Sequence, residues 1–192
     1  METPIHRLEP HANIVKSIGR VRCAVLGARG LVAQRLLQRL TNHHWFVPVL
    51  VVGSPESEGM RISELPWSFD EPKPHLPNIR VTGVGQDGDL AKRLISEGVS
   101  IVFSALPDSP ASQIEKDLAM SGLVVISHST IHRHSEKVPL IVPEVNNGHL
   151  KLTDLQTEYG GGMLVSCSNC MVVPLAISLA PLIRFLPVDS VT

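Results

Sequence analysis

The segment from residue 22 to residue 53 has the pattern of a strand, a helix and a second strand, and it constrains the fold more than any other part of the chain. The apolar runs RCAVLG (22–27) and FVPVLVVG (46–53) have the length of buried strands. Between them, one helical face is apolar at Leu31, Val32, Leu36, Leu37 and Leu40. Two strands joined through a helix in this way pair in parallel.

The same alternation continues along the chain. Further strands are expected at 79–82, 100–104 and 123–127, with helices at about 89–97 and 109–121. We therefore predict an α/β fold with a Rossmann-like, doubly wound and mainly parallel sheet. Its ligand crevice should lie beyond the carboxyl ends of the strands.

The composition is that of one soluble globular domain. The chain has 192 residues, of which 43% are hydrophobic and 18% charged, enough for a single substantial core. A net charge of -1 argues against a nucleic-acid partner, and three cysteines without an extracellular spacing indicate a reducing, cytoplasmic location. Residues 1–20 lack a signal-peptide core and are expected to form a flexible arm, followed by one domain over 21–192.

A stretch without charged residues runs from Met163 to Ile183. Its length would suit a membrane span, but Pro174 and Pro181 interrupt it and polar side chains gather near its start. We interpret it as a short strand followed by a buried helix, and we expect no membrane association.

Two local motifs suggest chemistry. The glycines of GARGLVA (27–33) stand where a tight strand-to-helix turn lets backbone N–H groups approach a pyrophosphate. Cys170 follows a Ser-Asn pair and opens the apolar segment, and the free N–H groups of a helix start favour the thiolate form. A buried structural cysteine is the alternative interpretation.

Four motifs in series resemble the aspartate-semialdehyde dehydrogenases, especially their archaeal and fungal branch. They are GARGLVAQ (27–34), FSALPDSPASQIEKDLAMSG (103–122), VPLIVPEVN (138–146) and SNCMVVPLAISLAPL (168–182). The resemblance covers about residues 21–192. It implies a nicotinamide-dinucleotide domain that carries a cysteine nucleophile, followed by a second domain that supplies an acid/base histidine, substrate contacts and the dimer interface.

The resemblance also implies roles for individual residues. Cys170 matches the nucleophile and Asn169 the residue beside it. The residues matching the cofactor site are Gly27, Arg29, Gly30, Leu31, Val32, Ser54, Ala105, Leu106 and Pro107. The cofactor is NAD or NADP by resemblance, but Glu56 and Glu58 follow Ser54 and should repel the 2'-phosphate of NADP. A chain that binds no cofactor is the other possibility.

The segment PVDSVT (187–192) resembles the start of the strand that leads into the family's second domain. We therefore expect a truncated nucleotide domain without the catalytic and dimerisation domain. The interpretation we favour is a reduced semialdehyde-dehydrogenase-like oxidoreductase that acts on a small carbonyl compound in a pocket around Cys170. A cofactor-independent isomerase, cyclase or lyase on the same scaffold, or a non-catalytic partner subunit, are the alternatives. Uncovered apolar surface on such a domain predicts a homo-oligomer.

A histidine-rich loop, SHSTIHRHSEK (127–137), follows the strand expected at 123–127. His128 is a candidate acid/base group in place of the family's usual amide, because imidazole titrates near neutral pH. Arg133 matches a basic residue of the family and, with His132, is a candidate for binding an anionic substrate. The spacing of His128, His132 and His134 would permit a metal, but we predict none and regard a solvated loop as the alternative.

Overall fold

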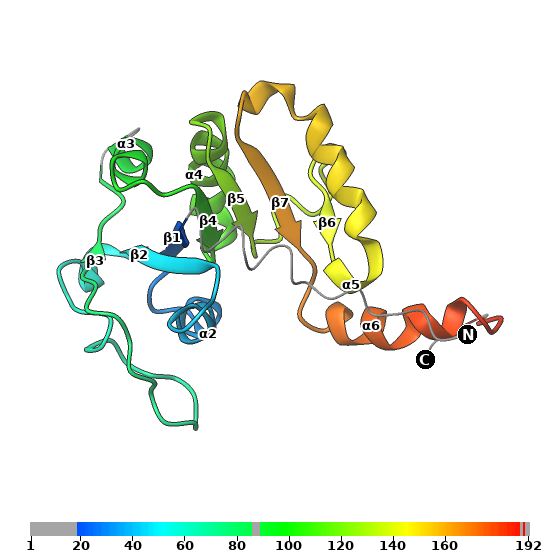
Figure 1. The fold of residues 1–192 in the computed structure, drawn as a ribbon, viewed down its shortest axis with the longest axis horizontal. Coiled ribbons are helices and arrows are strands. Elements are labelled where there is room, and N and C mark those ends of the chain that lie inside the picture. The colour runs from blue at the N-terminus through cyan, green and yellow to red at the C-terminus, as the bar shows by residue number, and fades with distance from the viewer. Residues whose placement is uncertain (1–18, 86–88, 189, 191–192) are drawn as a thin grey trace.

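The computed structural model describes residues 19–85, 89–188 and 190 of the chain (Figure 1). The predicted N-terminal arm, residues 1–20, lies outside the described residues except for its last two. It stays a prediction.

The described residues form a sheet in which all the paired strands are parallel, in the order β3-β2-β1-β4-β5-β7-β6 (Figure 1). The strands are β1 (Val21–Leu26), β2 (Phe46–Val52), β3 (Val81–Thr82), β4 (Ile101–Ser104), β5 (Val124–Ser127), β6 (Leu140–Ile141) and β7 (Met163–Cys167). The strand order reverses direction between β1 and β4, which is the position where doubly wound folds bind ligands. The predicted Rossmann-like α/β fold is confirmed.

The described helices are α2 (Leu31–Leu40), α3 (Asp89–Ser96), α4 (Asp108–Met120), α5 (Pro143–Asn146) and α6 (Val172–Ile183), with 3-10 turns η1 (Pro55–Ser57), η2 (Asn147–Leu155) and η3 (Thr157–Tyr159). The helices α2, α3 and α4 lie close to the predicted positions, the helix predicted in the C-terminal apolar stretch is α6, and α5 was not predicted. The strand β6 and the turns η1 to η3 were not predicted. β6, η1 and η3 are each too short to carry a periodic pattern, and the nine residues of η2 include no buried residue that would mark one face.

Two apolar cores cover the two faces of the sheet. Alternate residues of β1 point to opposite faces, so Ala24 and Leu26 pack with α3 and α4, whereas Cys23 and Val25 pack with α2. On β4 and β5, the residues facing α4 are buried, while those facing the other way are only half-buried. This second set comprises Ile101, Phe103, Val124 and Ile126.

The prediction of a strand followed by a buried helix near the C-terminus is wrong in one respect. The strand β7 and the helix α6 are both present, but no residue of α6 is buried. The helix extends away from the body of the sheet (Figure 1). Leu175 and Ile183 are more than half exposed, because the short helix α5 packs against α6 but leaves much of its apolar surface uncovered. None of the described helices combines the length and apolar character that a membrane span requires.

Candidate functional site

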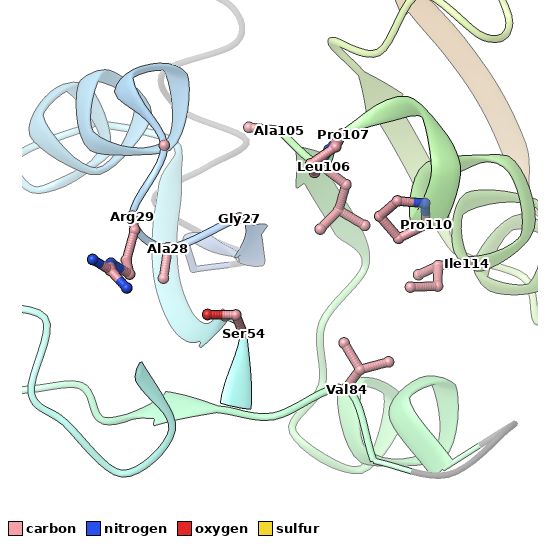
Figure 2. Close-up of a pocket in the computed structure, with 12 residues that line it drawn as sticks. Gly27, Ala28, Arg29, Ser54, Val84, Ala105, Leu106, Pro107, Pro110 and Ile114 are labelled. Carbon is pink, nitrogen blue, oxygen red and sulfur yellow. The ribbon is translucent and has the colours of Figure 1, made fainter. Parts of the chain in front are cut away.

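A cavity of about 420 Å³ lies beyond the carboxyl ends of β1, β2 and β4, at the point where the strand order reverses. It is lined by Gly27, Ala28, Arg29, Gly30, Gly53, Ser54, Val84, Ala105, Leu106, Pro107, Pro110 and Ile114. Figure 2 shows the apolar side chains of Leu106, Pro110 and Ile114 across the cavity from the turn at Gly27–Arg29 and from Ser54. An apolar wall facing a glycine turn suits a flat base on one side and a phosphate on the other.

The glycine turn is shaped by Gly27, whose φ of 94° lies in the left-handed region. The N–H groups of Gly27 and Ala28 both donate to the carbonyl oxygen of Val52, at 2.9 and 3.0 Å, which fixes the turn to the end of β2. A Cβ atom on Gly27 would lie 2.5 Å from the carbonyl oxygen of Ala105. Only glycine therefore fits at this position without moving the backbone.

The turn leads directly into α2. Gly30 is the residue before the helix, so the N–H groups of the first helical turn have no partner within the helix and can bind an anion. The buried side chain of Gln34 holds the turn in place: its amide nitrogen donates to the carbonyl oxygen of Arg29 at 2.9 Å, and its amide oxygen accepts from the N–H of Ser68.

Most of the predicted cofactor residues line this cavity. Leu31 and Val32 do not, but they form the exposed first turn of α2 and contribute backbone N–H groups there. The sequence prediction missed Val84, Pro110 and Ile114, which are cavity wall residues from the segment after β3 and from α4.

The two glutamates after β2 occupy different surroundings. A hydrogen bond from the Ser54 side chain, a second from its own backbone N–H and the charge of Arg29 lower the pKa of Glu56. The carboxylate of Glu56 is therefore ionised and lies beside the cavity residues Ser54 and Arg29. The carboxylate of Glu58 instead lies against Gly83, where it would meet an added Cβ.

Cys170 is exposed and lies in the turn between β7 and α6. Asn169 shapes this turn, because its side-chain oxygen accepts from the N–H of Met171 at 2.8 Å and its carbonyl oxygen accepts from Val172 and Val173. Cys170, Asn169 and His128 are not among the described residues that line the cavity. The predicted pocket around Cys170 is therefore not the cavity seen here.

The other two cysteines are less accessible. Cys23 is buried in β1, and burial raises the pKa of its thiol to about 12. Cys167, at the end of β7, is half-buried, and burial raises its pKa while the charge of Arg133 lowers it.

The predicted histidine loop follows β5, as expected. The ring Nδ1 of His128 lies 3.1 Å from the carbonyl oxygen of Ser104. Because a carbonyl oxygen can only accept, this contact favours the tautomer with the proton on Nδ1 and leaves Nε2 as an acceptor. Burial lowers the pKa of His128, so the ring is neutral at pH 7.

His132 lies in the interior rather than on a substrate-facing surface. It is 3% exposed, and its Nε2 lies 2.9 Å from Oε2 of the fully buried Glu115. This placement argues against the predicted contact with substrate and favours a structural role.

Arg133 is half-buried and bridges two strand ends. Its Nε donates to the carbonyl oxygen of Cys167 and its Nη2 to the carbonyl oxygen of His128, both at 3.1 Å. The predicted anion-binding side chain is thus already engaged at two of its nitrogens. Among the described residues, no group of three or more His, Cys, Asp or Glu side chains is arranged to hold a metal ion.

The cysteine turn and the cavity both lie at the carboxyl ends of the parallel strands. The cavity extends over the ends of β2, β1 and β4, and the next strands along the sheet are β5, which leads to His128, and β7, which leads to Cys170. Two strand spacings separate β7 from β4, about 10 Å. An extended ligand seated in the cavity could therefore reach toward the turn of Cys170.

Comparison with known proteins identifies relatives that match most of the chain. The model of the semialdehyde dehydrogenase NAD binding domain matches residues 22–153. The aspartate-semialdehyde dehydrogenase of Archaeoglobus fulgidus is 35% identical over 166 residues, which are 85% of this chain and 46% of the relative. The enzyme of the same name from Trichophyton rubrum is 33% identical over 180 residues, covering 89% of this chain and 47% of the relative.

A solved structure agrees with these sequence relatives. The crystal structure of aspartate semialdehyde dehydrogenase with NADP from Candida albicans superimposes with a TM-score of 0.73 at 30% identity, over 89% of this chain and 49% of that one. The chain thus spans about half the length of the relatives it matches.

Proposed function

The chain belongs to the semialdehyde dehydrogenase family, whose NAD binding domain it carries, and from this premise we propose that it takes part in nicotinamide-dependent oxidation or reduction of a small carbonyl compound, with Cys170 as the nucleophile. One observation carries the proposal. The glycine-turn cavity and the exposed Cys170 both lie beyond the carboxyl ends of the parallel strands, and two strand spacings separate β4 at the cavity from β7.

The residues of the cavity fit a dinucleotide. Gly27 lies so close to the backbone of Ala105 that no side chain fits there, and the first N–H groups of α2 have no partner within the helix and are available to a pyrophosphate. The apolar wall of Leu106, Pro110 and Ile114 suits the adenine. A bound nicotinamide would supply a hydride acceptor or donor.

The chain's own chemistry would begin at Cys170. Its thiolate sulfur attacks the carbonyl carbon of the substrate, a carbon–sulfur bond forms, and the carbonyl π electrons move to the oxygen, which takes a proton from water. Asn169 holds the turn that presents the sulfur. His128, with Nε2 free to accept, is our candidate for removing the thiol proton.

A direct test is a titration of the full chain with NAD and NADP, followed by an absorbance assay with small semialdehydes. We expect dinucleotide binding, and loss of turnover in the Cys170→Ala variant. Absence of binding to either dinucleotide at millimolar concentration would contradict the proposal. Turnover of a carbonyl compound without a dinucleotide, lost in His128→Ala but not in Cys170→Ala, would instead support the cofactor-independent alternative.

We further propose that NAD is preferred over NADP, because the charged carboxylate of Glu56 lies beside Ser54 and Arg29 at the cavity. A carboxylate here can accept from a ribose hydroxyl but repels a phosphate. Replacing Glu56 with arginine should raise the affinity for NADP relative to NAD by about tenfold or more, measured by calorimetric titration.

The matched control for Glu56→Arg is Asp154→Arg, which makes the same charge change on the exposed side of η2. It should leave the NAD to NADP ratio unchanged. A wild-type chain that binds NADP more tightly than NAD would overturn the assigned role of Glu56, as would a ratio that Glu56→Arg does not alter.

We also propose that the chain forms a homo-oligomer. The support is the apolar surface of α6 together with the half-buried face of β4 and β5, which a second copy would remove from water. Light scattering at tens of micromolar should give at least a dimeric mass. Leu175→Arg, on α6 and 53% exposed, should lower that mass.

The control for Leu175→Arg is Ile95→Arg, because Ile95 is similarly exposed, at 50%, but lies on α3. It should leave the mass unchanged. A monomeric wild-type chain at these concentrations would contradict the oligomer.

A further inference from the structure

A buried contact between Glu115 and His132 links α4 to the loop that follows β5. Glu115 is 0% exposed and His132 3% exposed, and the atoms Oε2 and Nε2 lie 2.9 Å apart. The pair is not aligned as a hydrogen bond, and within the described residues neither oxygen of Glu115 has a hydrogen-bond donor. The imidazole is therefore the polar group that faces this buried carboxyl group, and loss of either side chain would leave the other buried without that polar neighbour.

The sheet face beneath α4 carries a row of buried polar side chains. Ser104, Ser127 and Ser166 lie side by side in register at the ends of β4, β5 and β7. All three are fully buried, and each comes two residues after a core residue of its strand, Val102, Val125 or Leu164, so it points to the same sheet face. Because α4 packs against β5 and β7, this row of hydroxyl groups lies on the sheet face that the helix covers.

Arg133, the residue after His132, links this loop to the strand that leads to Cys170. Arg133 binds the carbonyl oxygens of His128 and Cys167, so it joins the end of β5 to the end of β7. Cys167 lies three residues before Cys170. The first residue of α4 secures the same loop, because the carboxylate of Asp108 accepts from the side chains of Ser129 and Thr130.

We propose that Glu115 and His132 are positioning residues: their buried contact sets the place of the loop, so that Arg133 holds the end of β7 and fixes the turn that presents Cys170. This inference rests on the proposed nucleophilic role of Cys170. It gives a reason why a charged side chain occupies the buried side of α4.

The test compares two measurements in the full chain. One is the rate at which iodoacetamide alkylates Cys170, given as a ratio to the rate of a small free thiol and followed by mass spectrometry. The other is amide hydrogen exchange of the peptide covering residues 164–171. The variants are Glu115→Leu/His132→Phe, which replaces the pair by apolar groups, Arg133→Met, and the combination of all three changes. Lys137→Met, which removes an exposed ion pair with Glu158, is the control.

We expect the double variant and Arg133→Met each to lower the alkylation ratio by about fivefold and to speed exchange at the end of β7. Because Glu115 and His132 are proposed to act on the Cys170 turn only through Arg133, the triple variant should show no change beyond that of Arg133→Met. Lys137→Met should match the wild type. Wild-type behaviour of the double variant would overturn the proposal, and so would additive effects in the triple variant.

Replacing a buried ion pair with apolar residues is often tolerated, but the double variant could fail to fold. Glu115→Gln then decides, because it keeps the shape and an acceptor but replaces the carboxyl group with an amide. It should lower the ratio about twofold and speed exchange at the end of β7, whereas unchanged values overturn the proposal. A wild-type Cys170 that reacts no faster than Cys167 would contradict the nucleophile itself. Hydrogen exchange does not depend on thiol reactivity, so it tests the positioning role separately.

Discussion

Replacing Gly27 with alanine is expected to lower the free energy of unfolding by at least about 2 kcal/mol and to abolish dinucleotide binding. Two causes act together. The φ of 94° disfavours any residue with a Cβ, and that Cβ would lie 2.5 Å from the carbonyl oxygen of Ala105. The obstacle is backbone, so it cannot rotate away. Urea denaturation followed by circular dichroism measures the first effect, and calorimetric titration the second.

Gly30→Ala is the matched control, because it adds the same methyl group three residues later. Gly30 has a φ of -69°, and an added Cβ would make only an ordinary contact, 3.4 Å from the carbonyl oxygen of Gly27. Stability should fall by less than about 1 kcal/mol. Gly30 lines the cavity, however, so dinucleotide binding should still weaken. Equal stability of the two variants would contradict the strain assigned to Gly27.

The sequence predicted the parallel sheet well because strand and helix periodicity is a local property. The helix α2 was expected from its apolar face and begins and ends where expected. The two-residue strand β6 exists only because it pairs with β7, and no local pattern indicates such a partner. The exposure of α6 could not be predicted either, because an apolar composition does not say which surface covers a helix.

The candidate site was predictable where it follows strand ends. Gly27, Ser54 and Ala105 come directly after β1, β2 and β4 or one residue later, so the fold itself brings them together. Glu115 was missed, although its spacing carried a signal. It stands four residues after Ala111 and three before Leu118, on the buried stripe of α4, where a lone carboxylate needs a partner. The identity of that partner, His132, depends on the tertiary structure.

Cys170 is expected to react with iodoacetamide at neutral pH about tenfold faster than Cys167, and Cys23 should stay essentially unlabelled in the folded chain. The thiolate is the reactive form, and burial raises the pKa of Cys23 to about 12, so its thiolate is scarce near pH 7. Cys167 is half-buried and burial also raises its pKa, whereas Cys170 is exposed in the turn before α6. Mass spectrometry of labelled peptides at several times gives the three rates.

Labelling in concentrated urea is the control, because unfolding removes the differences in burial and should bring the three rates close together. Equal or slower labelling of Cys170 than Cys167 in the folded chain would contradict its assignment as the nucleophile. Faster labelling would leave one further step to establish, because an exposed thiol can react with iodoacetamide without taking part in turnover. The Cys170→Ala variant resolves this step: loss of carbonyl turnover with dinucleotide binding retained would place the sulfur in the reaction rather than in the cofactor site.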